Sequence, residues 1–168
     1  MLIKAKSETD STPAGWKTLN PIDTDTHSGG EIFYCENEFY HVNTICRATD
    51  VKDAEGNLIF ENDRLKSADY IAANLLIDEE QTNPENFYSN PVVRWVPERS
   101  AFYLMSERIV QTAPKIINTN KDIHADYEVD HIRTVRFVAL TEDEARHWVV
   151  YGNILDNFDD ADDFSSDN

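Results

Sequence analysis

The chain of 168 residues has little glycine, little cysteine and few positive charges. Its five glycines fall in neither a G-x-G-x-x-G nor a G-K-[ST] arrangement, so no phosphate-cradling loop is indicated. No serine lies in a nucleophile elbow. Two cysteines, Cys35 and Cys46, are too few for a disulfide framework, and we expect both to be small core residues. The sequence therefore indicates a protein that is not an enzyme and uses no cofactor.

Long apolar runs are missing as well. No stretch approaches the roughly 20 apolar residues that a membrane-spanning helix needs. The N-terminus has no apolar run of the length of a signal peptide. We therefore expect a cytoplasmic protein without a membrane partner.

Positive charge is scarce because 15 Lys and Arg stand against 32 Asp and Glu, a formal charge of −17. Such a charge repels DNA, RNA and anionic membranes, and it attracts basic proteins. The one basic strand, with Arg133 and Arg136 and with Lys121 nearby, is expected to pair with the protein's own carboxylates. We therefore expect a basic protein as partner and no direct nucleic-acid partner. Solubility alone is the competing explanation of the charge.

Apolar residues make up 40% and aromatic residues 11% of the chain, which is enough for a hydrophobic core. Short β-prone runs between turn residues predict an α+β protein that is mainly β, with a small barrel-like antiparallel sheet and one or two short helices. We divide the chain into a polar N-terminal segment (1–30) whose composition allows flexibility, a β-rich domain (31–155) and an acidic tail (156–168). A helical insertion is expected near 67–77.

Turn residues predict where the strands begin and end. Glu36 and Asn37 separate two apolar runs, and the D-A-E-G-N turn at 53–57 separates two more, so each pair of runs predicts a hairpin. A third hairpin is predicted around the turn at 97–100. Polar and apolar residues alternate over 134–137, as in a half-buried strand, and the apolar residues 138–140 extend it. Residues 15–19 predict a short strand or a packed anchor. Further strands are predicted at 45–48 and 148–151, the last ended by Gly152 and Asn153.

Two segments have helical signals. Apolar residues recur at helical spacing over 70–76, which predicts a helix of about three turns with Ser67 as its cap. A T-x-x-E capping box at 141–144 predicts a short helical turn. The polar stretch 114–127 is expected to be a long connection.

Three segments, in order along the chain, carry a family resemblance. Residues 53–63, DAEGNLIFEND, contain a D-x-x-G turn followed by an aromatic residue and an acid; residues 93–95 and 102–104 are V-R-W and F-Y-L; residues 149–157 are VVYGNILDN. In this order they resemble the opening signature, the central hairpin and the closing motif of the YopX-like family of phage and prophage proteins. The resemblance covers about 51–157, apart from an insertion near the first predicted helix.

The resemblance implies a small β-rich protein with a compact barrel-like part, located in a bacterial host cytosol. It supplies no established enzymatic activity and no catalytic residues. The matching residues have a structural interpretation: Gly56 and Gly152 allow backbone conformations barred to other residues, and Asp63 accepts backbone N–H bonds at the end of a hairpin. The full set of structural motif residues is Asp53, Gly56, Phe60, Glu61, Asp63, Trp95, Gly152 and Asn153.

The acidic tail is the candidate partner-binding element. Acidic residues with spaced aromatic residues can dock into a basic groove that has an apolar pocket, although such a run is also typical of a solvated tail. The candidate residues are Asp156, Phe158, Asp159, Asp160, Asp162, Asp163 and Phe164.

A cluster of metal-ligand residue types lies at His124, Asp126, Asp130 and His131. Histidine and aspartate are good metal ligands, and a metal-dependent hydrolase would need such groups to converge on one point. Their spacing fits no standard zinc pattern, and a polar loop is the competing interpretation. We expect no bound metal.

Three hypotheses of function remain open. The first is a non-enzymatic acidic phage or prophage binding protein that inhibits, or mimics DNA toward, a host nucleic-acid-binding or defence protein of the restriction or CRISPR type. The second is a structural or self-assembling phage protein, a homo-oligomer whose sheet edges pair. The third is the metal-dependent hydrolase.

Overall fold

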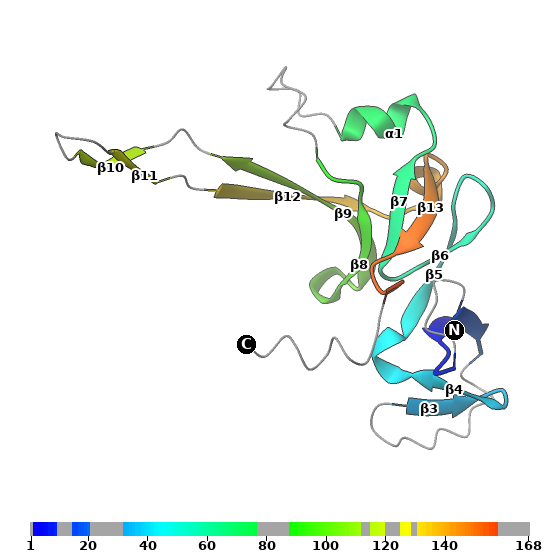
Figure 1. Ribbon diagram of the computed structural model, residues 1–168. Coiled ribbons are helices and arrows are strands. Elements are labelled where there is room, and N and C mark those ends of the chain that lie inside the picture. The colour runs from blue at the N-terminus through cyan, green and yellow to red at the C-terminus, as the bar shows by residue number, and fades with distance from the viewer. Residues whose placement is uncertain are drawn as a thin grey trace.

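The computed structural model describes residues 2–9, 15–20, 32–76, 88–111, 115–119, 125–128 and 131–157. Antiparallel strands dominate these residues and two short helices accompany them, which confirms the predicted fold class (Figure 1). The strands form a four-stranded sheet, a five-stranded sheet and two separate hairpins. No helix in these ranges is long and apolar enough to cross a membrane.

The four-stranded sheet includes the N-terminal part of the chain. Its strands, in spatial order, are β2 (Trp16–Leu19), β1 (Ile3–Lys6), β5 (Cys46–Lys52) and β6 (Leu58–Phe60). β2, β1 and β5 curl into a half-barrel, in agreement with the predicted barrel-like sheet. Of the two interpretations of residues 15–19, the strand is the one that the structure confirms, as β2. β1 lies in the segment 1–30 and was not predicted, although its sequence I-K-A-K alternates apolar and polar residues; Lys6, at its end, is buried.

A separate hairpin, β3 (Ile32–Cys35) with β4 (Glu38–His41), is bridged to this part of the chain through Ser7 and Tyr40. Its turn residues Glu36 and Asn37 have φ of 47° and 70°, as in the two-residue turns that match the strand twist. This predicted hairpin is therefore confirmed, and so is the second, between β5 and β6. A 3-10 helix, η3 (Val42–Thr44), leads from β4 toward β5.

The five-stranded sheet is antiparallel throughout. Its strands, in spatial order, are β12 (His131–Ala139), β9 (Ala101–Gln111), β8 (Val92–Val96), β7 (Asp63–Ser67) and β13 (Trp148–Asn153). The predicted hairpin of β8 and β9 turns through η5 (Pro97–Arg99). β9 and β12 run beyond the other strands as an arm (Figure 1). The predicted strand over 134–140 is confirmed. The strand predicted to end before Gly152 continues to Asn153 through a bulge.

A further hairpin lies where we predicted a long connection. β10 (Lys115–Thr119) pairs with β11 (Ala125–Glu128), so the prediction for 114–127 is wrong. A two-stranded ribbon needs no continuous apolar face directed at a core, and the alternation that marks the other strands is weak here.

The number of helices agrees with the prediction, but the bounds and the cap of α1 do not. In α2 (Glu142–Ala145), the Thr141 hydroxyl accepts a bond from the Glu144 amide at 3.1 Å, which confirms the predicted cap. α1 (Tyr70–Leu75) is shorter than predicted, and its cap is Asp69, whose Oδ1 accepts from the Ala72 amide at 3.0 Å. Ser67 is the last residue of β7 instead. A strand that runs to residue 67 leaves no room for an earlier helix start.

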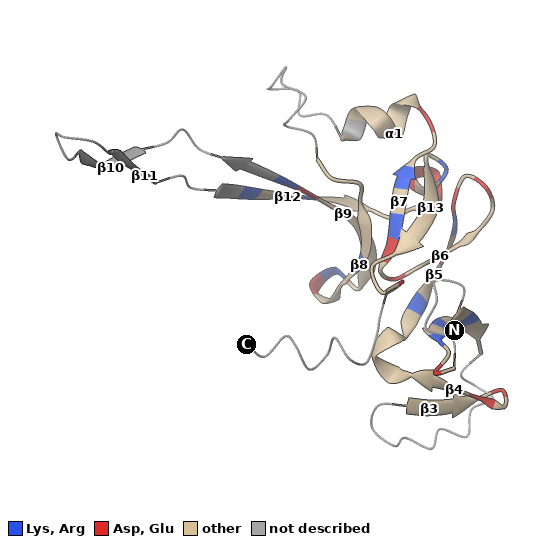
Figure 2. Ribbon diagram, viewed as in Figure 1, with Lys and Arg blue, Asp and Glu red and all other residues tan. Residues whose placement is uncertain are grey.

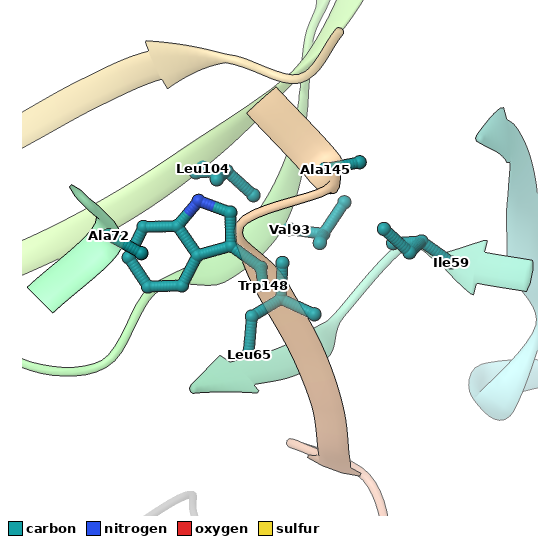
Figure 3. Packing of buried hydrophobic residues seen from close by; sticks show 7 residues of the cluster. All are labelled: Ile59, Leu65, Ala72, Val93, Leu104, Ala145 and Trp148. Carbon is teal, nitrogen blue, oxygen red and sulfur yellow. The ribbon is translucent and has the colours of Figure 1, made fainter. Parts of the chain in front are cut away.

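The main core lies against one face of the five-stranded sheet. Trp148 packs there against side chains from β7, β8, β9 and both helices (Figure 3), and its indole N–H donates to Glu144 Oε1 at 2.9 Å. The buried members of this cluster are Ile59, Leu65, Ala72, Val93, Leu104, Ala145 and Trp148. α1 contributes Ala72 to it, whereas Tyr70 and Ile71 of the predicted apolar face are 79% and 57% exposed.

We predict that Asp69→Ala lowers the melting temperature by roughly 2–4 °C, because the first turn of α1 loses its cap. Ser67→Ala, the matched control at the residue that the sequence favours, should change it by less than about 1 °C. A hydrogen bond from His147 holds the pKa of Asp69 below its usual range. The capping contribution is therefore present above the ordinary pKa of aspartate and is lost as the pH falls through the lowered value. Equal effects of the two substitutions would contradict this assignment.

Both thiols are buried, as predicted. Burial raises the pKa of Cys46 to about 11. A thiol reacts through its thiolate, so at pH 8 we expect neither cysteine of the native protein to be labelled on the timescale of a free thiol. Both should be labelled in denaturant. Rapid labelling of one thiol in the native state, measured by mass spectrometry, would show that its strand opens readily.

Candidate functional site

The polar residues of the matching segments form a buried network between the two sheets. Asp63 accepts bonds from the Phe60 amide at 2.8 Å, from Asn153 Nδ2 at 2.9 Å and from the Lys4 ammonium. Burial raises the pKa of the Asp63 carboxyl, and the Lys4 ammonium and these hydrogen bonds oppose that shift. One carboxylate thus joins β7 to β13 and to β1, and the predicted backbone bond to Asp63 is confirmed.

Asp53 has a similar role in the turn at 53–57. Its Oδ1 accepts from the amides of Glu55 and Asn57, both at 2.9 Å, and its Oδ2 accepts from the Val150 amide at 3.0 Å. The turn is thereby fastened to β13. Gly56 has a φ of 86°, as predicted for a glycine that adopts a backbone conformation barred to other residues.

Arg47 is held between a carboxylate and two aromatic rings. Its guanidinium donates to Glu61 from two nitrogens, at 3.0 and 3.2 Å, and lies 4.6 Å from the ring centroid of Trp95. Trp95 packs edge-on against Phe102, with centroids 5.0 Å apart. Phe60, the residue before Glu61, is buried in a smaller cluster with Cys46. These motif residues therefore stabilise the fold.

The prediction that Gly152 adopts a backbone conformation barred to other residues is wrong. Its φ is outside the left-handed region, so it is not required for an unusual backbone conformation. A Cβ at this position would instead lie 3.0 Å from Asp156 Oδ2, which is too close for an ordinary contact. A side chain at residue 152 would therefore press on the Asp156 carboxylate, which would have to shift by a few tenths of an ångström.

Asp156 belongs to the folded part of the chain rather than to the tail. Its carboxylate accepts from the Asn153 amide and from Trp16 Nε1, both at 2.8 Å, and its carbonyl accepts from the buried Lys6 ammonium. The other six candidate tail residues, from Phe158 to Phe164, lie outside the described residues.

The metal-ligand cluster is only partly described. Asp126 lies in β11 and His131 in β12, whereas His124 and Asp130 lie outside the described residues. Within the described ranges, no group of three or more His, Cys, Asp or Glu is placed to hold a metal ion.

The five-stranded sheet has a second face, turned away from the main core. Leu65, Val93 and Leu104 point into the core, so their neighbours on β7, β8 and β9 point outward. We call this surface the outer face. Its charged and aromatic members, with Arg99 from the adjoining η5, are Arg64, Lys66, Arg94, Arg99, Tyr103, Glu107, Arg133, Phe137 and Tyr151.

Two open hollows lie on the outer face. One, of about 370 Å³, is lined by Arg64, Arg94, Tyr151 and Glu107, the last paired with Arg133, and by Ile154 just beyond β13. The other, of about 280 Å³, is lined by Val96, Arg99, Tyr103 and Phe137. Each hollow therefore combines an arginine with an aromatic side chain.

The aromatic side chains of the outer face are accessible. Phe137 is 52% and Tyr151 47% exposed. Tyr103 meets Phe137 edge-on, with centroids 6.4 Å apart, and the Arg99 guanidinium carbon lies 5.9 Å from the Tyr103 centroid. Exposed aromatic rings beside arginine are enriched at binding surfaces.

The outer face is also basic. Arg64, Arg94 and Arg99 form no ion pair with any described residue, although Arg94 donates to the Asn62 amide oxygen at 2.6 Å. Figure 2 shows Lys and Arg along β7 and β12. On β12, Arg133 pairs with Glu107, as predicted from the sequence.

The negative charge is unevenly distributed along the chain. The described residues carry 14 Lys and Arg against 17 Asp and Glu, a formal charge of −3. The remaining residues carry 1 Lys against 15 acids, a formal charge of −14. The acidity therefore belongs mainly to a few segments outside the described body and much less to its sheets.

The sequence did not predict a basic outer face, because the net charge of the chain is strongly negative and says nothing of where single arginines lie. Arg64 and Arg94 each lie between two residues that are buried or half-buried, and this alternation was available as a signal. Tyr103 lies in the apolar run A-F-Y-L-M, which does not alternate. The arrangement of three strands side by side could not be predicted from the sequence.

No family model, no curated protein and no solved structure matches the chain. Function therefore has to be inferred from geometry and charge.

The folded boundary after Asn157 can be tested by truncation. We predict that in 0.5 M salt, where charge attraction between the segment and the body is screened, deleting residues 158–168 leaves the melting temperature within about 1 °C of the full chain. Deleting 156–168 should lower it by roughly 2–8 °C, because three hydrogen bonds to Asp156 are lost. Equal melting temperatures of the two truncated chains in calorimetry would show that Asp156 belongs to the tail after all.

Proposed function

We propose that this chain is a non-enzymatic binding protein that captures a basic partner through its acidic C-terminal segment, carried on a β-rich body. The observation that supports this most directly is the division of charge between the C-terminal segment and the body. The segment 158–168 has five Asp, two Phe and no base, whereas the described residues carry a formal charge of only −3. Acidic side chains supply attraction to a basic surface, and the phenylalanines supply apolar anchors.

The roles of the motif residues support a binding function over catalysis. Asp53 and Asp63 accept bonds from backbone amides, and Asn153 donates to Asp63, all within the body. These polar groups are thereby used in joining strands. The outer face has hollows but pairs its aromatic residues with arginines, which is a recognition chemistry rather than a hydrolytic one.

The division of charge also favours one form of the proposal. A rigid mimic of DNA needs regularly spaced carboxylates on the folded surface, and the described body is nearly neutral with a basic face. An acidic segment requires no such regular spacing. The resemblance to YopX-like proteins supports a phage or prophage setting, in which the partner would be a host nucleic-acid-binding or defence protein.

The test is binding of a defined basic probe, a fluorescent 20-residue peptide of Lys, Arg and Leu, measured by anisotropy. We expect the full chain to bind it at low salt, and deletion of 158–168 to weaken binding by about tenfold or more, a loss of about 1.4 kcal/mol. Phe158→Ala with Phe164→Ala should weaken it less and leave the salt dependence unchanged. Undiminished binding by the truncated chain would contradict the proposal.

A further inference from the structure

We infer that the outer face of the five-stranded sheet is the docking surface for the chain's own residues 158–168, and that it holds this segment when no basic partner is bound. The contact would regulate the acidic segment that the proposed function uses for binding, so its biological meaning rests on that proposal. The docking itself can be measured without any partner.

Charge complementarity is the first support. The outer face presents Arg64, Arg94 and Arg99, none of which forms an ion pair with a described residue. The segment supplies five carboxylates and no cation. Arginine binds carboxylates with two parallel hydrogen bonds, so such pairs are both strong and geometrically selective.

The spacing of apolar groups is the second support. Phe158 and Phe164 are six residues apart, or about 20 Å in an extended chain. Tyr151 on β13 and Phe137 on β12 mark the two hollows and are separated by four strand spacings, or about 19 Å. One extended segment can therefore place a phenylalanine in each hollow while its aspartates pass the arginines.

The point of attachment is the third support. Ile154, three residues before the last described residue, lines the larger hollow. The segment therefore begins beside one hollow. Its eleven residues reach about 36 Å when extended, more than the width of the five strands, about 19 Å. A short tether also gives an effective concentration in the millimolar range.

The total charge favours this occupant over other anions. A formal charge of −17 repels free polyanions such as nucleic acids, and this repulsion slows their encounter with a small basic face. A segment of the same chain does not have to reach the outer face by diffusion from solution. Docking therefore neutralises the arginines within one chain, and a basic partner has to compete with them for the same aspartates.

The experiment uses the full chain with Ser165→Cys and a nitroxide label on that cysteine, since Cys35 and Cys46 are buried. We expect paramagnetic broadening of the amide signals of Arg94, Tyr103 and Phe137 at low salt. The broadening should fall at least threefold in 0.5 M salt and in the double variant Arg94→Glu, Arg99→Glu.

The matched control is Arg146→Glu. Arg146 is an exposed arginine beside α2, which packs on the core side of the sheet, so its charge reversal should leave the broadening unchanged. Uniform broadening over the body, or none on the outer face, would overturn the inference. Broadening seen only when labelled and unlabelled chains are mixed would overturn docking within one chain, because the occupant is then a second copy.

Two results separate this inference from the proposed function. With docking present, the double arginine variant should bind the basic probe peptide about three- to tenfold more tightly, because the aspartates are released. If the outer face shows no broadening while deletion of 158–168 still abolishes probe binding, the inference fails and the proposed function stands. If docking is seen and probe binding does not depend on the segment, the inference stands and the proposed function fails.

Discussion

The buried carboxylate of Asp63 is the interaction on which the rest of the fold depends. A buried charge costs several kcal/mol unless it is paired and fully hydrogen-bonded, on the order of 3–5 kcal/mol when one partner is removed. Here the Phe60 amide, Asn153 and Lys4 meet that requirement from three separate strands or their edges. Because the donors come from β1, β6 and β13 while Asp63 itself begins β7, one side chain fixes how the N-terminal strand meets the five-stranded sheet.

The same constraint decides what the outer face presents. Asp63 points inward, so Arg64 must point outward, and Leu65 returns to the core. A shift of one residue in the pairing would bury the arginine and expose the carboxylate. The basic outer face is therefore coupled to the buried network, although the two share no contact. A nearly neutral body with one basic face can then carry strongly acidic segments without losing its core.

Much of the fold followed from local patterns. Turn residues with positive φ, such as Glu36, Asn37 and Gly56, marked two hairpins, and Thr141 marked a helix cap. The errors arose where a neighbour in space decided the outcome. β1 ends in a buried lysine whose ammonium bonds to the Asp156 carbonyl far along the chain. α1 starts late because β7 pairs with β13 up to Ser67. Gly152 is favoured by the position of Asp156 and not by its own backbone angles.

The sequence by itself determined the mainly β class, most strand positions, the burial of both cysteines and the acidic character of the C-terminal segment, because each depends on composition or on residues a few positions apart. The tertiary structure decided that the polar motif residues join strands, that Asp156 belongs to the body, and that Arg64, Arg94 and Arg99 share one face with Tyr103, Phe137 and Tyr151. Those residues come from five strands and a turn between 64 and 151, and only strand order and register bring them together.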